Sequence, residues 1–279
     1  MHHAALLALA AGSDRPGKFP FAARRKIGTV ARMKRVVTSV LGLVFAAALV
    51  FTPSASAQEN TMNAAAVAKG GHFVKPEAFD IAKILPEPPP AGSLAAQSDL
   101  EAVLQAQAWR TPEQAEWALF IDKDNPFNHA SVLGAWFTKA NLPGTAALLS
   151  DVTEDTNAVG ALTKKFFSRP RPSQIDPRVQ PLVPVPATAA YPSGHVTRAF
   201  TWALVLAEIF PDKREELLAR AHRAGWGRVL AGIHFPTDLV GGRLLAEAVV
   251  AELKKSAAFR AAVEKCRAEA AAVAVKKAA

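Results

Sequence analysis

Seven prolines fall within residues 170–192 and constrain the fold of this chain more than any other feature. They are Pro170, Pro172, Pro177, Pro181, Pro184, Pro186 and Pro192. Proline lacks a backbone N–H and fixes its own φ angle, so a regular helix or strand cannot continue through such a run. We therefore predict a long rigid loop without a regular element, and long ordered loops often carry function.

On both sides of this loop the apolar residues follow helical spacing. Thr111, Pro112 and Gln114 form a capped helix start, which predicts a helix as far as about Asp122. The same spacing predicts further helices at 99–109, 130–140, 143–167 with a break near Asp155, 194–210, 212–231, 237–255 and 257–277. Alternating strand patterns are scarce. The sequence therefore predicts an all-α fold with one domain.

The N-terminal part resembles a leader rather than a folded domain. Residues 33–57 start with a basic Met-Lys-Arg, continue with an apolar run and end in Ala-Ser-Ala, which is typical of a signal peptide cleaved after Ala57. Residues 1–32 form an upstream extension, and an uncleaved anchor is the alternative. We expect a periplasmic or secreted protein with an extended Pro-rich segment at 58–97 and a helical domain at 98–279.

The distribution of charge argues against a nucleic-acid-binding protein. The chain has a net charge of +9, but residues 1–57 hold eight of its 33 basic residues and one of its 24 acidic residues. The remaining 25 basic and 23 acidic residues leave the body nearly neutral, without the basic surface that such proteins carry. After residue 57 no apolar run reaches the roughly 20 residues that span a bilayer. We expect no stable membrane insertion after the signal peptide is cleaved.

A tight turn, Pro192-Ser193-Gly194-His195, comes directly before the apolar run 196–210. A helix that begins here would present unpaired N–H groups and a partial positive charge, which favour an oxyanion such as phosphate. His195 could then give a proton to a leaving group. Alone, this turn is equally compatible with an ordinary helix start.

Two further groups of residues fit the same chemistry. Lys164 precedes Arg171 by seven positions, a spacing that the alternatives Lys165 and Arg169 do not reproduce. Arg228 is followed by His234 and then by Asp238, one helical turn later, so that a carboxylate could orient an imidazole base. The three cations match the oxygens of a phosphate. Each group alone has a structural explanation. The three groups together, in this order, indicate a phosphate-binding site.

Together these groups resemble the signature of the type 2 phosphatidic acid phosphatase/vanadium haloperoxidase superfamily. The exported layout, the Pro-rich stretch 85–93 and the pair Asp155-Thr156 are similar to the bacterial class A non-specific acid phosphatases. The resemblance covers roughly residues 85–250. It implies a single-domain helical bundle of the acid phosphatase/vanadium haloperoxidase type.

The resemblance also implies a role for each site residue. His234 would be the nucleophile that forms a phosphohistidine, Asp238 would orient it, and His195 would be the general acid. The phosphoryl oxygens would be bound by Lys164, Arg171, Ser193, Gly194 and Arg228. No cofactor or metal is expected, the substrates would be small phosphate esters, and the optimum would be acidic. Because one histidine must be neutral and the other protonated, their pKa values should differ.

Several residues leave open questions. Gly227 stands where the family usually has a serine before the arginine, so a hydroxyl near the phosphate could be missing. Arg198 could add a contact to the substrate, although an ion pair on its own helix is the simpler expectation. Tyr191 could form a wall of the pocket or pack in the core. The other histidines, His72, His129 and His222, are expected to be structural or at the surface.

Three other functions fit parts of this pattern. They are a vanadate-dependent haloperoxidase, a lipid or isoprenoid phosphate phosphatase, and an exported phosphate-binding protein without turnover. The sequence does not identify the preferred ester, and a homo-oligomer stays open.

Overall fold

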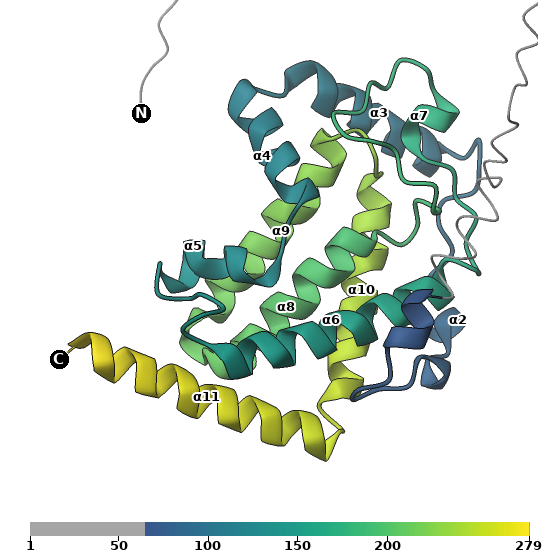
Figure 1. The fold of residues 1–279 in the computed structure, drawn as a ribbon. Coiled ribbons are helices and arrows are strands. Elements are labelled where there is room, and N and C mark those ends of the chain that lie inside the picture. The colour runs from purple at the N-terminus through teal and green to yellow at the C-terminus, as the bar shows by residue number, and fades with distance from the viewer. Residues whose placement is uncertain (1–64, 279) are drawn as a thin grey trace, which may run out of the picture. The chain divides into compact units, whose positions relative to one another are not determined.

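Helices are the only regular elements in residues 65–278, the part of the chain that this computed structural model describes (Figure 1). The all-α prediction is confirmed. Side chains are described as far as Val273. These residues belong to one unit, Phe51–Ala279, and the expected leader (33–57) and upstream extension (1–32) lie outside the described residues. The helices after the N-terminal turns are α2 (Ile81–Ile84), α3 (Leu94–Trp109), α4 (Pro112–Asp122), α5 (Ala130–Leu133), α6 (Pro143–Thr163), α7 (Pro172–Ile175), α8 (Gly194–Ile209), α9 (Arg214–Leu230), α10 (Pro236–Leu253) and α11 (Ala257–Ala278).

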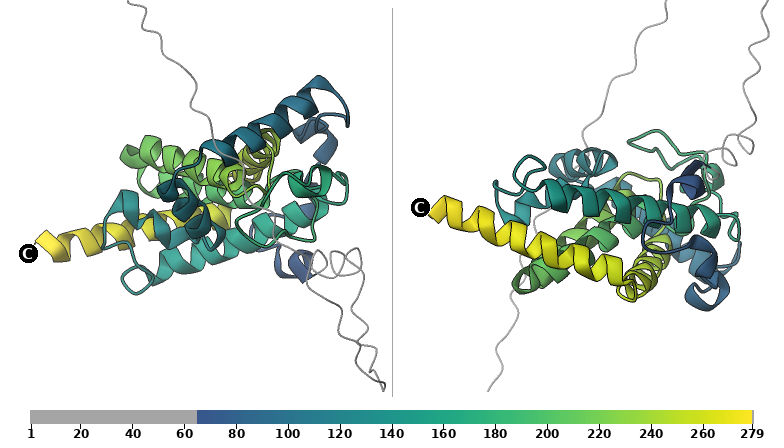
Figure 2. Two further views of the ribbon diagram at one scale, coloured as in Figure 1. Left: turned by 90° about the horizontal axis from the view of Figure 1, so that it is seen from above. Right: turned by 60° about the horizontal axis from the view of Figure 1, so that its bottom comes forward.

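Helix α8 forms the centre of the core because it is apolar on nearly every side. Twelve of its 16 residues are buried, which is expected of a helix that is surrounded by others. It packs against α9 and α10, and α6 crosses it. Helix α4 packs on α9, and the last helix, α11, runs beside α6 (Figures 1 and 2). Among the described residues, no helix combines the length and the apolarity that a bilayer crossing requires.

Two elements differ from the sequence prediction because of local chemistry. The helix expected at 130–140 ends at Leu133, since Gly134 adopts a φ of 101° that continues no right-handed helix. The proline-rich loop is not entirely irregular: Pro172 begins the four-residue helix α7, where its missing N–H costs nothing. The capped start at Thr111 is confirmed, with Thr111 and Gln114 bonding each other's backbone N–H groups.

Helix α6 runs unbroken through Asp155, where a break was expected. The carboxylate of this residue is fully buried and accepts four backbone N–H groups, from Gly71, His72, Phe73 and Val74, at 2.6–3.2 Å. Its side chain therefore does not compete for the backbone of its own helix. We call residues 65–74 the N-terminal strap. Asp155 fixes this strap along α6.

Helices α8 and α10 approach each other closely at two glycines of α10. A Cβ atom at Gly242 would lie 2.7 Å from the carbonyl oxygen of Ser193, and one at Gly241 would lie 2.5 Å from the ring of Tyr191. Both distances are shorter than real Cβ contacts. The glycines thus allow the turn before α8 to lie directly against the start of α10.

Candidate active site

The loop between α9 and α10 places His234 beside the first turn of α10. The Oδ2 atom of Asp238 accepts the backbone N–H of Phe235 at 2.9 Å and lies 3.1 Å from His234 Nδ1. Both side chains are buried. Since a carboxylate only accepts hydrogen bonds here, Nδ1 carries the imidazole proton and Nε2 keeps a lone pair. The expected pairing of a base with an orienting acid is present in this geometry.

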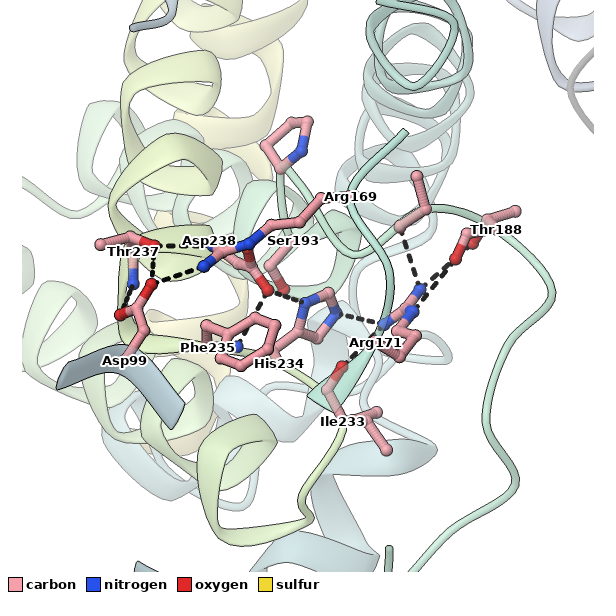
Figure 3. Close-up of polar contacts among 12 residues, drawn as sticks. Asp99, Arg169, Arg171, Thr188, Ser193, Ile233, His234, Phe235, Thr237 and Asp238 are labelled. Atoms are coloured by element: carbon pink, nitrogen blue, oxygen red, sulfur yellow. Dashed lines mark hydrogen bonds and ion pairs between the residues drawn. The ribbon is translucent and has the colours of Figure 1, made fainter. Parts of the chain in front are cut away.

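Arg171 closes the other side of this histidine (Figure 3). Its Nη1 donates to the carbonyl oxygen of Ile233 at 3.0 Å and lies 2.9 Å from His234 Nε2. The same guanidinium donates to the Thr188 carbonyl oxygen through Nε. The lone pair of His234 Nε2 therefore faces an arginine.

Lys164 approaches from the end of α6 rather than from the proline-rich loop. It is the C-cap residue of that helix, and its Nζ donates to the carbonyl oxygens of Ala189 at 2.5 Å and Pro192 at 3.1 Å. Arg171 begins α7 within the loop. The proline-rich loop therefore carries Arg171, and its backbone carbonyl oxygens accept hydrogen bonds from Lys164.

Arg169, which the spacing argument set aside, is the second partner of Asp238. Its Nη1 donates to Asp238 Oδ1 at 2.6 Å, and its Nη2 donates to Asp99 Oδ2 at 2.6 Å (Figure 3). The guanidinium also lies 4.2 Å from the ring centroid of Phe235. Thr237 donates its hydroxyl to Asp99. Arg169, which is itself held by the buried Asp99, thus fixes the orientation of Asp238. No local pattern links Asp99 on α3 to this site, because its partners lie at least 70 positions away.

The turn before α8 supplies donors at a helix N-terminus, as expected. Ser193 is fully buried, its N–H donates to the Asp238 carbonyl oxygen at 3.0 Å, and its Oγ has no partner among the described residues. Gly194 is the first residue of α8, and His195 follows with Nε2 3.3 Å from the Asp122 carbonyl oxygen. An unsatisfied buried hydroxyl is uncommon and indicates a missing acceptor or ligand.

Arg228 shows the same signature on α9. It is fully buried, its Nη2 donates to Asp122 Oδ1 at 2.9 Å, and its Nε and Nη1 have no partner in residues 65–278. Sequence reasoning missed Asp122, which fixes this arginine. Unpaired buried N–H groups on a cation match the equatorial oxygens of a phosphoryl group.

The two histidines, Lys164 and Arg171 border a cavity of about 340 Å³, together with Gly194. The other lining residues are Ala66, Thr156, Asn157, Gly160, Ala161, Pro186, Thr188, Thr197 and Arg198. Of the three remaining predicted residues, Asp238 contacts the lining residue His234, Ser193 directly precedes Gly194, and Arg228 pairs with Asp122. The structure thus places five of the eight predicted residues on the cavity wall.

Both site histidines have a lowered pKa, which favours their neutral form. Burial and the charges of Arg198 and Arg228 lower the pKa of His195 to about 2. Burial and the charges of Arg171, Lys164 and Arg228 lower the pKa of His234 well below its usual value. The sequence predicts pKa values that differ in direction, but surrounding cations lower both. A bound phosphate dianion would offset these cations and favour protonation of His195.

The contacts of Gly227, Tyr191 and Arg198 show where these three residues lie relative to the cavity. A Cβ at Gly227 would lie 3.4 Å from the Trp117 ring and 3.6 Å from Ile121, in the contact between α9 and α4 and away from the cavity. Tyr191 packs in the core, where its hydroxyl donates to the Pro86 carbonyl oxygen. Arg198 lines the cavity, and within residues 65–278 no carboxylate is in ion-pair distance.

The remaining histidines have structural surroundings. His129 is fully buried, His72 lies 2.9 Å from Glu154, and His222 stacks edge-on against Phe200. Among the described residues, no group of three His, Cys, Asp or Glu could hold a metal ion.

Comparison with known proteins shows which family and which proteins the chain is similar to. Residues 144–261 match the model of the PAP2 superfamily. The chain is 28% identical over 205 residues to a non-specific acid phosphatase of Providencia stuartii, covering 69% of this chain and 82% of that protein. It is 29% identical over 194 residues to a non-specific acid phosphatase of Salmonella typhimurium, covering 66% and 78%.

Among solved structures, a bacterial vanadium-dependent iodoperoxidase is similar with a TM-score of 0.49 and 21% identity, over 64% of this chain and 54% of that one. The family match spans α6 to the start of α11 and includes all eight predicted site residues. The chain therefore contains a PAP2 superfamily domain.

Proposed function

We propose that this protein is an exported acid phosphatase that hydrolyses small phosphate monoesters through a phosphohistidine at His234. The PAP2 domain and the two relatives named non-specific acid phosphatase support phosphatase activity. One observation carries the mechanism: Asp238 holds the Nδ1 proton of His234, so that Nε2 is a lone pair beside the cavity and its cations.

In the first step, His234 Nε2 attacks phosphorus and the bond from phosphorus to the ester oxygen breaks. Lys164, Arg171 and Arg228 hold the equatorial oxygens, where negative charge is concentrated in the transition state. Arg228 Nε and Nη1 and Ser193 Oγ, which have no hydrogen-bond partner among the described residues, would donate to these oxygens. His195, protonated once the dianion is bound, gives its proton to the leaving alcohol.

In the second step, water attacks the phosphohistidine and the bond from phosphorus to Nε2 breaks. His195, neutral after the first step, takes a proton from this water and is again the acid for the next cycle. Orthophosphate leaves, and His234 returns to its starting form. Asp238 and Arg169 keep the imidazole in one orientation during both steps.

The decisive test is His234→Ala with His222→Ala as the matched control. We expect His234→Ala to lose turnover of an aryl phosphate by at least about 10³-fold while the fold is retained. His222 packs on Phe200 outside the cavity lining, so His222→Ala should keep turnover. Acid-quenched wild-type enzyme should carry labelled phosphate on His234. Full turnover by His234→Ala would overturn the mechanism, and stoichiometric binding without hydrolysis would identify a phosphate-binding protein.

The other enzymatic possibilities predict different products. Halide oxidation that appears only with vanadate and peroxide would identify a haloperoxidase. Hydrolysis restricted to phosphate esters within vesicles would identify a lipid phosphatase. For export, N-terminal sequencing of the mature protein should find Gln58 as the first residue.

A further inference from the structure

Arg198 is a partly buried cation that the proposed reaction does not use. It lies one helical turn after His195 on α8 and lines the same cavity. Its Nη1 donates to Asn157 Oδ1 on α6 at 3.3 Å, and no described carboxylate lies within ion-pair distance. A partly buried guanidinium whose hydrogen-bond partner is a neutral amide has no direct counter-ion. Such a group favours an anion in the adjacent cavity.

The position of Arg198 indicates which part of a substrate it faces. In an in-line displacement, the nucleophile and the leaving group lie on opposite sides of phosphorus. Arg171 contacts His234 directly at 2.9 Å, whereas Arg198 lies one helical turn after His195 on α8. The cavity therefore has an attacking side at His234 and a leaving-group side at His195. Arg198 and Asn157 belong to the leaving-group side.

The cavity continues beyond Asn157 along the N-terminal strap. Ala66 of the strap lines the main cavity, and an adjoining space of about 210 Å³ is lined by Ala65, Ala66, Lys69, Glu154 and Asn157. Lys69 adds a second cation there. The carboxylate of Glu154 already contacts His72, whose Nε2 lies 2.9 Å away. A leaving group can thus extend from His195 past Arg198 towards Lys69.

We propose that Arg198, held by Asn157, binds a second anionic group on the leaving portion of the substrate. The preferred substrates would then be phosphate esters with a further phosphate or carboxylate, such as bisphosphates, rather than esters of neutral alcohols. This inference rests on the proposed function for the reaction itself, but it concerns a separate group of residues. It predicts that a ligand with two anionic groups binds better than one with a single group.

The test compares two phosphonates, because their bond from carbon to phosphorus is not hydrolysed and binding can be measured without turnover. The probes are 3-hydroxypropylphosphonate and propane-1,3-diyl bisphosphonate, which have the same carbon chain. Calorimetric titration of the wild-type protein should give a Kd about tenfold lower or better for the bisphosphonate, as expected for one charge-assisted hydrogen-bond site. The ratio of the two Kd values is the readout.

Two variants test whether Arg198 causes the difference between the two Kd values. Arg198→Met removes the cation, and Asn157→Asp keeps it but gives it a carboxylate partner. Both should reduce the Kd ratio to within about twofold of one. Arg243→Met is the control for general loss of charge, because Arg243 is exposed on α10 and 3.7 Å from Glu247. It should leave the ratio unchanged.

Three results would overturn the proposal. A wild-type ratio near one would show that no second anion site exists. An equal loss of affinity for both probes in Arg198→Met would place Arg198 with the transferred phosphoryl group. An unchanged ratio in both variants would show that other residues select the second anion. Failure of the proposed function would be detected separately. The wild-type protein would then not hydrolyse phosphate monoesters, but the ratio of the two phosphonate Kd values could still be measured.

Discussion

At the scale of single residues, Arg169 supports both the fold and the site. Replacing Arg169 with Met would leave Asp99 and Asp238 buried without a cation. Breaking a buried ion pair in this way costs about 3–5 kcal/mol, so we expect a loss of this size in the free energy of unfolding. Urea denaturation measures the loss. We also expect a lower kcat, because Asp238 loses the bond that fixes its Oδ1.

The double variant Arg169→Met/Asp99→Asn separates charge burial from other causes. Removing one of the two orphaned carboxylates should recover part of the lost stability. Arg178→Met is the matched control, since Arg178 pairs with Asp176 at the surface and exposed ion pairs contribute little to stability. Equal losses in Arg169→Met and Arg178→Met would contradict this account.

Gly227 tests whether the departure from the family pattern affects phosphate binding. The position of its missing Cβ, in ordinary contact with Trp117, predicts that Gly227→Ser fits without displacing a neighbour. Since the new hydroxyl points towards α4, we expect kcat/KM for an aryl phosphate to change by less than about twofold. Steady-state kinetics with orthophosphate as inhibitor checks this. A tenfold tighter inhibition by orthophosphate would mean that the serine reaches the site.

The sequence identified eight candidate site residues but not the residues that surround them. Lys164, Arg171, His195, His234 and Asp238 occur at spacings that local chemistry and the family resemblance make readable. Asp99 and Asp122 have no such spacing, because their partners lie 70 and 106 positions later in the chain. The pKa of His195 likewise depends on how many cations converge on it, which only the packed helices determine.

At the scale of elements, Asp155 is the anchor of the N-terminal strap. Asp155→Ala would leave four backbone N–H groups of residues 71–74 without their shared acceptor. We expect a loss of about 3–5 kcal/mol in the free energy of unfolding, and faster hydrogen exchange confined to the strap. Mass spectrometry of exchanged peptides locates the effect.

Asp151→Ala is the control for this variant, because Asp151 is an exposed carboxylate one turn earlier on the same helix. It should unfold at nearly the same urea concentration as the wild type. If the strap keeps its exchange protection in Asp155→Ala, the anchoring role is wrong.

Long apolar helices were predictable as elements, whereas their ends depended on tertiary contacts. Helices α8, α9 and α10 begin and end within about three residues of the ranges expected from apolar spacing. The expected break at Asp155 is absent because the strap, more than 80 positions earlier, satisfies its carboxylate. The short α5 shows the opposite case, where a single glycine conformation ends a helix that spacing would continue.

At the scale of the whole molecule, buried neutral histidines set the pH dependence of stability. The pKa of His129 is lowered to about 4 and that of His195 to about 2, with burial as the first cause. Below pH 6.5 the unfolded chain binds protons that these folded residues do not. Stability is therefore complete above pH 6.5 and falls as the pH is lowered, by up to about 1.4 kcal/mol per pH unit for each histidine.

Urea denaturation from pH 7 to pH 4 measures this slope. The variant His129→Gln should show a shallower slope while keeping turnover, since His129 contacts the Pro126 carbonyl oxygen outside the cavity lining. A stability that stays constant or rises on acidification would contradict the neutral assignment.

One oxygen atom joins the start of α10 to the imidazole of His234. Asp238 Oδ2 accepts the Phe235 N–H, at the N-terminus of the helix, and contacts His234 Nδ1. The direction of the Nε2 lone pair and the geometry of the first turn of α10 are therefore fixed together. Under the proposed mechanism, a protein engineer could not change the direction of attack without also rebuilding the start of α10, and could not transfer His234 to another protein without that helix start.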